Sequence, residues 1–238
     1  MNRGPIILGL DASTGASSVA LVLGGHILSR CEPGERATTG GLLGLIDALL
    51  AEAGVARSAL DALAVTRGPG GFTGVRIGVG VAQGIALGLE RPVIALSTLQ
   101  VLAETVVARQ RADSPVAGVL AVLDARMGEV YAARYRCRQP ADESPRDGAR
   151  TRLEGEEALL TPAAVPALAP GWQAAGSGLA AHPPLAERLG GAPDVAAVPD
   201  IGAAMPLALA LHAAGEGSDA AALQPVYLRD RVADQPKS

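Results

Sequence analysis

The chain has 238 residues, which is enough for one large domain or for two small lobes with a buried core. Its composition is typical of a globular protein, with 49% hydrophobic and 18% charged residues. The net charge of −4 and the absence of a basic run argue against unaided binding to nucleic acid. The first apolar run is too short for a secretory signal or a membrane span, so we expect a cytoplasmic protein that does not enter a membrane.

Strands and helices are expected to alternate in the first half of the chain. Apolar runs predict strands at residues 6–10, 19–23, 26–28, 63–66 and 92–96. The Gly-Gly pair between the second and third runs is a hairpin signal.

Three helices are predicted in the same half. Apolar residues recur at helical spacing from Leu42 to Leu49, and Gly54 is a suitable C-cap. A second helix covers 74–90, directly after a glycine-rich loop. The sequence from Ser97 to Gln100 is a capping box that opens a third helix.

The second half begins the pattern again. Strands are expected at 118–123 and 129–135, the second antiparallel to the first, and another runs from Trp172 into a glycine turn. Asp200 precedes a final helix. The apolar tail at 225–229 is expected to dock on the protein.

One stretch of the second half has no apolar period. Residues 136–157 are rich in Pro, Arg, Asp and Glu, and we expect a solvated excursion there.

A six-residue pattern, L-D-A-x-x-G, occurs at 10–15 and again at 123–128, each time after an apolar strand and before a second strand. This duplication predicts an α/β protein of two related lobes. We place the lobes at 1–112 and 113–238, with the last segment packing back on the first lobe.

The stretch RGPGGFTGVRIGVGVAQGIALG, residues 67–88, raises the question of phosphate binding, because a glycine loop that opens a helix often cradles an anion. A Walker loop would need a lysine that is absent here. The dinucleotide fingerprint fails as well, because Thr73 stands where its third glycine should be.

Packing is the other explanation for these glycines. On a helix over 74–90, the polar side chains Arg76, Gln83 and Glu90 share one narrow stripe, and nearly all other positions are apolar or small. Internal glycine costs about 1 kcal/mol relative to alanine, so close approach of another backbone must offset it. Either the helix packs wholly within its own lobe, or one row of small residues faces the core and the other a partner chain. The two rows are Gly74, Gly78, Ala82 and Ala86, and Gly80, Gly84 and Gly88.

Asp11 is the strongest candidate for residual chemistry. It ends the first strand, where it could hold a metal-bound phosphate with Ser13 and Thr14, as in an ATP-dependent phosphotransferase. The same three residues could instead cap the turn. Asp124 is its counterpart in the second lobe.

Other polar residues carry weaker signals. Arg126 and Glu129 are expected to form a surface ion pair. The three histidines, His26, His182 and His212, have no metal-ligand spacing, so no metal site is expected.

Four segments together resemble the TsaB (YeaZ-type) family of bacterial tRNA threonylcarbamoyladenosine biosynthesis. They are GLDASTGASSVALVLGGHIL, DALAVTRGPGGFTGVRIGVGVAQGIALGLERPVIALSTLQVLAE, LDARMGEVYAARY and QPVYLRD. The resemblance is loose between about residues 136 and 222. It implies an actin/Hsp70/sugar-kinase-like (ribonuclease H-like) fold of two duplicated lobes.

The resemblance also implies a role. Such a chain is a non-catalytic partner of the related TsaD subunit, and with TsaE the complex modifies the adenosine beside the anticodon in tRNAs reading codons that start with A. ATP and metal are then expected on TsaD and TsaE, not here, and tRNA is met only through the complex. A homodimer is expected when TsaD is absent. The residues expected at the partner interface are Leu42, Leu45, Ile46, Leu49, Phe72, Arg76, Gly80, Gln83, Gly84 and Leu87.

Overall fold

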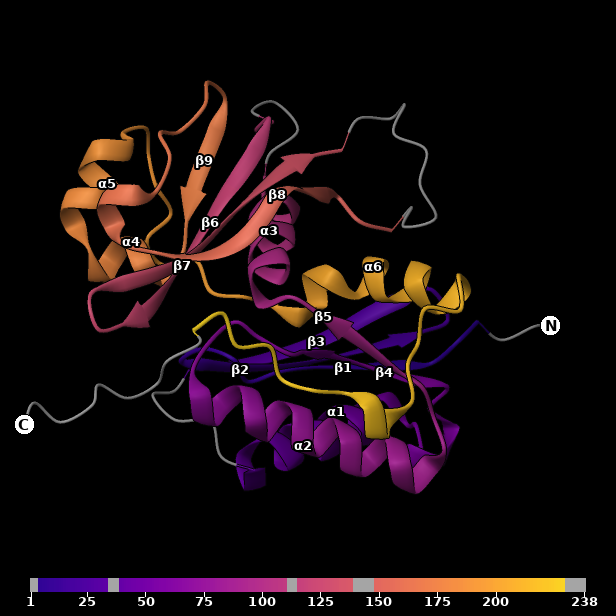
Figure 1. Ribbon diagram of the computed structural model, residues 1–238. Helices are drawn as coiled ribbons and strands as arrows, with labels where there is room; N and C mark the ends of the chain where they lie inside the picture. The colour runs from indigo at the N-terminus through magenta and orange to yellow at the C-terminus, as the bar shows by residue number, and fades with distance from the viewer. Residues whose placement is uncertain (1–3, 34–38, 111–114, 139–147, 230–238) are drawn as a thin grey trace, which may run out of the picture.

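The computed structural model describes residues 4–33, 39–110, 115–138 and 148–229. Its strands form two mixed sheets, one in each of two α/β lobes (Figure 1). This confirms the predicted duplication.

The first sheet has five strands in the order β3-β2-β1-β4-β5. β1 pairs antiparallel with β2 and parallel with β4, and Gly24 and Gly25 make the predicted hairpin turn between β2 and β3, both with positive φ. The strands are β1 (Ile7–Asp11), β2 (Ala16–Leu23), β3 (His26–Pro33), β4 (Ala62–Thr66) and β5 (Val93–Leu96).

The second sheet repeats this plan with four strands in the order β8-β7-β6-β9. β6 pairs antiparallel with β7 and parallel with β9, as β1 does with β2 and β4. The strands are β6 (Gly118–Arg126), β7 (Glu129–Cys137), β8 (Thr151–Leu160) and β9 (Trp172–Ala175).

Six helices among the described residues cover the two sheets. Ser97 caps α3 as predicted, and Asp200, which was expected to precede the last helix, caps α6. Each side chain accepts a hydrogen bond from an amide in the first turn. The short helices α4 and α5 were not expected from the sequence. The helices are α1 (Thr39–Ala53), α2 (Phe72–Leu89), α3 (Thr98–Ala108), α4 (Ser177–Ala181), α5 (Pro183–Leu189) and α6 (Ile201–Ala213).

Each sheet is covered on both faces. α1 and α2 pack on one face of the first sheet, and α6 packs on the other. α3 covers one face of the second sheet, and α4 and α5 cover the other. Figure 1 shows α3 and α6 between the two sheets, where they contact each other.

The two lobes do not divide at residue 112 when each helix is assigned to the sheet on which it packs. α3 precedes that boundary but contributes Leu99 and Leu102 to the core of the second lobe. α6 follows it but covers the first sheet, where Met205 and Ile201 fill the space above Gly9. The chain therefore crosses between the lobes, and its last helix packs back on the first.

The expected excursion at 136–157 is largely wrong. β8 occupies 151–160 and pairs with β7, and the buried carboxylate of Glu104 holds its start by accepting from the amides of Arg150 (3.0 Å) and Thr151 (2.9 Å). Burial raises the pKa of Glu104. β8 carries charged residues because it is an edge strand, which hides its period from sequence reasoning. Residues 139–147 lie outside the described part of the chain.

Candidate partner-binding surface

The glycine loop between β4 and α2 packs on the backbone of the β1–β2 turn. The amide of Gly71 donates a hydrogen bond to the carbonyl of Ser13, at 2.8 Å. A side chain at Gly70 or Gly74 would collide with the carbonyl oxygen of Ser13 or Ala12. These two glycines therefore serve close contact inside the lobe.

The carboxyl group of Asp11 is fully enclosed at the end of β1. Its Oδ1 accepts hydrogen bonds from the Ser13 amide (3.1 Å) and hydroxyl (2.5 Å) and from the Thr66 hydroxyl. Burial is the largest influence and raises the pKa of Asp11, although these hydrogen bonds oppose it. The buried Oδ2 of Asp11 and the buried hydroxyl oxygen of Thr14 have no hydrogen-bond partner among the described residues. Through its Oδ1, Asp11 caps the turn with Ser13, as the second alternative predicts.

Helix α2 buries one of its two rows of small residues in the first lobe. A β-carbon at Gly78 would lie 3.8 Å from both Ala12 and Val65, in ordinary van der Waals contact. Further along the row, Ala82 and Ala86 are buried. The fold of the lobe alone therefore accounts for this row.

The other row of α2 is open. Nothing in the described residues lies within 4 Å of a β-carbon at Gly80, Gly84 or Gly88, and the neighbouring Phe72 and Leu87 are each 55% exposed. By length and composition α2 could cross a membrane, a test that the core helix of a folded domain also passes, yet only 33% of it is buried. An apolar helix with so little cover is typical of a docking surface.

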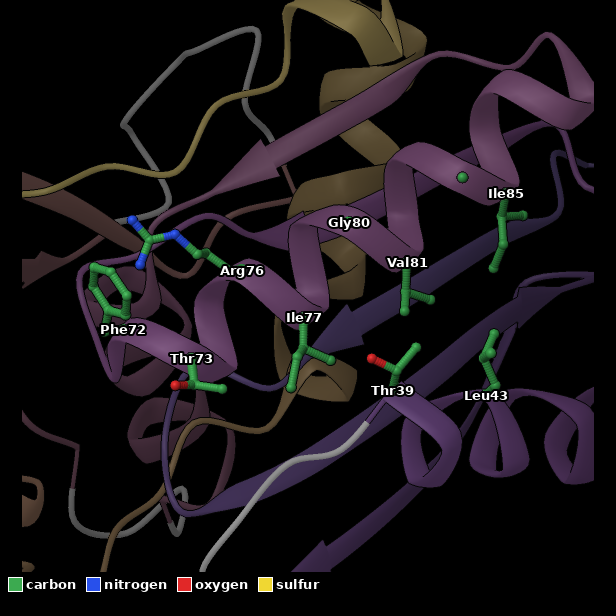
Figure 2. A pocket seen from close by; sticks show the side chains of 10 residues that line it. Thr39, Leu43, Phe72, Thr73, Arg76, Ile77, Gly80, Val81 and Ile85 are labelled. Carbon is green, nitrogen blue, oxygen red and sulfur yellow. The ribbon is translucent and has the colours of Figure 1, made fainter.

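A groove of about 510 Å³ runs between α1 and α2 beside this open row (Figure 2). Figure 2 shows Ile77, Val81 and Ile85 pointing from α2 toward Thr39 and Leu43 of α1. Most of its lining is apolar, so covering it would remove apolar area from water.

Four residues predicted at the partner interface lie inside the first lobe instead. Leu42, Leu45, Ile46 and Leu49 are each at most 6% exposed and pack in the core. They form the apolar stripe with which α1 covers the sheet, so their prediction as partner contacts is wrong. α1 contributes Leu43 to the groove instead.

Gln83 is also engaged within the chain. Its Nε2 donates to the carbonyls of Ala220 (3.1 Å) and Leu223 (2.9 Å). Both belong to residues 217–229, here named the C-terminal strap, which runs along α2 (Figure 1). Gln83 therefore holds the strap, a role that the sequence did not indicate, and its contact with a partner stays a prediction.

Half of the ten predicted interface residues do lie on the exposed side of α2. They are Phe72, Arg76, Gly80, Gly84 and Leu87.

Sequence reasoning missed other residues of this surface. Tyr227 of the strap is 45% exposed and stacks near Phe72, with ring centroids 6.1 Å apart. The sequence offered one indication of Tyr227, because an aromatic residue in the tail is unusual in a chain with only 2% aromatic residues. Leu43 and Ile77 lie outside the regular apolar stripes, so periodicity assigned them no role.

The ion pairs beside the strap differ from the predicted one. Arg126 pairs with Asp124 at 3.1 Å, and Glu129 pairs with Arg229 of the strap at 2.7 Å. The expected Arg126–Glu129 pair is wrong, because the strap supplies the partner of Glu129.

No group of three or more His, Cys, Asp or Glu side chains in the described residues could hold a metal ion. His26 begins β3, His212 lies near the end of α6, and His182 precedes α5. Cys31 is exposed and Cys137 is buried, and both are free thiols.

The two duplicated lobes define a member of the actin-like, ribonuclease H-like class of α/β proteins. The chain is 37% identical over 236 residues to the tRNA threonylcarbamoyladenosine biosynthesis protein TsaB of Escherichia coli K12, covering 95% of this chain and 96% of that protein. It is 45% identical over 125 residues to the TsaB protein of Haemophilus influenzae, which covers 52% of this chain and 51% of that one. The chain therefore belongs to the TsaB family.

Structural similarity agrees with this assignment. The solved structure of YeaZ from Pseudomonas aeruginosa is 42% identical, with a TM-score of 0.81, and the match covers 94% of this chain and all of that one. A family model described as TsaD, tRNA N6-adenosine threonylcarbamoyltransferase, matches residues 34–146. That match spans less than half of the chain. It includes α2, so this helix lies in the part that is similar to the TsaD family.

Proposed function

We propose that this chain is a non-catalytic subunit of the tRNA threonylcarbamoyl transferase complex, acting in the cytoplasm as the partner of a TsaD-type paralogue. The printed names of its relatives place those proteins in the biosynthesis of tRNA threonylcarbamoyladenosine. The reaction is N6-threonylcarbamoylation of the adenosine beside the anticodon, in tRNAs that read codons starting with A. In this proposal ATP and metal act on the TsaD-type and TsaE-type subunits.

The open face of α2 is the observation that carries the proposal. Its exposed glycine row allows another helix to approach closely, and the adjacent groove offers apolar area to cover. A TsaD-type paralogue is the proposed occupant, and a second copy of this chain takes its place when that paralogue is absent.

The enclosure of Asp11 supports a role without catalysis. The carboxyl group of Asp11 has no exposed surface that a metal-bound phosphate could reach in this structure. The chain's negative net charge also favours contact with tRNA through the assembled complex rather than alone.

Reconstitution tests this proposal. The purified chain, the TsaD-type and TsaE-type proteins of the same organism, and their mixtures receive tRNA, ATP and threonylcarbamoyl adenylate as the donor, and are assayed for threonylcarbamoyladenosine in tRNA. We expect no product from this chain alone and full activity only when all three are present. Product from the chain alone, or undiminished product in its absence, would contradict the proposal.

A further inference from the structure

The guanidinium group of Arg76 lies over the ring of Phe72 and beside the ring of Tyr227, at the N-terminal end of α2. Its Cζ is 3.2 Å from the centroid of the Phe72 ring and 5.0 Å from that of Tyr227. Phe72 and Arg76 are four residues apart on the helix and therefore share a face. Stacking on the rings fixes the plane of the guanidinium group while its N–H groups stay available.

Arg76 has no anionic partner within the described residues. No carboxylate there forms an ion pair or a hydrogen bond with its side chain, although Arg30, Arg134 and Arg229 all have one. Arg76 lines the groove between α1 and α2, whose lining contains neither Asp nor Glu. An exposed, oriented cation thus stands at one end of an apolar docking surface.

The C-terminal strap fixes Tyr227 from both sides. The amide of Val226 donates to the carbonyl of Arg67 at 2.7 Å, in the loop before α2. On the other side, Arg229 donates to the carbonyl of Ala125 (3.2 Å) at the β6–β7 turn of the second lobe. The strap therefore spans both lobes and presents its tyrosine to the docking face.

We propose that Phe72, Arg76 and Tyr227 form a receptor for a carboxylate of the partner protein that covers α2. This proposal rests on the proposed function, and it adds the chemistry that the partner must bring to this end of the surface. A guanidinium group with free N–H edges can bind a carboxylate through two parallel hydrogen bonds. Covering the surface without such an anion would bury an unpaired charge.

A protein carboxylate fits this site better than a phosphate of RNA. Binding to a nucleic acid relies on several basic groups that neutralise successive phosphates. Here one unpaired arginine stands among apolar and aromatic side chains, on a chain whose net charge is −4.

Titration of the purified TsaD-type paralogue with Arg76→Gln tests the proposal, at 50 mM and at 500 mM salt. Compared with the wild type, we expect the Kd to rise about tenfold or more at low salt and to depend less on salt. Arg152→Gln, an exposed arginine change on β8, is the matched control and should bind like the wild type. Tyr227→Phe keeps the ring and should bind nearly normally, whereas Tyr227→Ala should weaken binding severalfold.

The outcomes separate the two proposals. Equal affinity of the wild type and Arg76→Gln at both salt concentrations would overturn the carboxylate receptor and leave the proposed function intact. Failure of the wild type to bind the paralogue would overturn both. Binding of tRNA by the wild-type chain alone, lost in Arg76→Gln, would identify a phosphate receptor and overturn the carboxylate assignment.

Chemical cross-linking identifies the anion directly. The chain has a single lysine, Lys237, so the double variant R76K/K237R carries its one lysine side chain at position 76. A carbodiimide joins that amine to a carboxylate in contact with it, forming an amide while the carbodiimide takes up the water as a urea. We expect a cross-linked peptide between 72–90 and an Asp or Glu of the paralogue, absent from K237R alone. Absence of this peptide in a complex that still forms would contradict the proposal.

Discussion

The two L-D-A-x-x-G turns have the same sequence pattern but different surroundings. In the first lobe the Asp11 carboxyl group is buried and bonded to Ser13 and Thr66. In the second lobe Asp124 is partly exposed and pairs with the exposed Arg126. A shared turn pattern therefore records common ancestry of the lobes, and it says little about chemistry at either aspartate.

Helix α2 of the first lobe and helix α4 of the second lobe each contain a glycine in close contact with other parts of the lobe, but the two helices differ in length. Gly74 of α2 packs closely on the carbonyl group of Ala12, and Gly178 of α4 packs closely on the side chain of Val122 and the backbone of Leu123. α2 then continues for 18 residues and α4 for only five. The close glycine contact is thus a demand of the lobe, whereas the open row of small residues belongs to α2 alone and points to a partner.

Adding bulk to the open row should give the largest effect. In Gly84→Leu the new side chain would hold the partner helix away, and we expect the Kd for the TsaD-type paralogue to rise about 100-fold or more. The chain itself should stay folded, because no atom of the described residues lies within 4 Å of a β-carbon there. Titration calorimetry and thermal melts measure the two quantities.

Ala181→Leu on the equivalent helix α4 is the control. Ala181 is exposed in the second lobe, so binding should not change. Equal binding by Gly84→Leu and wild type would remove the distinction between the two helices.

Adding one methyl group to each row should change the stability of the chain in opposite directions. In Gly74→Ala the new β-carbon would overlap the carbonyl oxygen of Ala12, and we expect a loss of about 3 kcal/mol in the free energy of unfolding. In Gly80→Ala no atom of the described residues lies within 4 Å of the new β-carbon, so the change should stabilise the isolated chain by up to about 1 kcal/mol through helix propensity. Urea denaturation measures whether each change lowers or raises the free energy of unfolding. Equal effects at the two positions would contradict the assignment of the rows.

The burial of Asp11 should make the free energy of unfolding depend on pH. Burial raises the pKa of Asp11 in the folded state above its ordinary value of 3.8, so its contribution to stability is complete below that pH and is lost as pH rises through the folded pKa. Relative to Asp11→Asn, the wild type should therefore lose stability as the pH rises from 4, by at most about 1.4 kcal/mol per pH unit. A difference between the two that stays flat from pH 4 to 8 would show an accessible, ordinary carboxylate.

Releasing the strap should have a modest and local effect. Gln83→Ala removes two hydrogen bonds to the carbonyls of Ala220 and Leu223, which we expect to cost about 1–2 kcal/mol. Gln110→Ala, which removes a bond to Gln173 between side chains of the second lobe, is a comparable control that leaves the strap alone. Hydrogen exchange should quicken across 217–229 in Gln83→Ala and not in the control.

Much of this fold could be predicted from local patterns. The buried strands, the Gly24-Gly25 hairpin and the cap at Ser97 are set by neighbouring residues, and the structure confirms them. The two rows of α2 could be separated as well, because a helix fixes which residues share a face.

The features that could not be predicted depend on contacts between segments that are far apart in the sequence. β8 is an edge strand held by Glu104, so its own sequence carries no clear period. Leu42 and its neighbours on α1 form an apolar stripe that could face either a sheet or a partner, and periodicity does not tell these apart. The hydrogen bonds of Gln83 to the strap were missed because their acceptors lie 137 or more residues away in the chain.

Hydrogen exchange on mixing this chain with the TsaD-type paralogue tests the central claim most directly. If the open face of α2 is the docking surface, amides in 72–90 and in the C-terminal strap should gain protection, while those of α4 and α5 should not change. Protection confined to the second lobe, with 72–90 exchanging as in the free chain, would contradict the account.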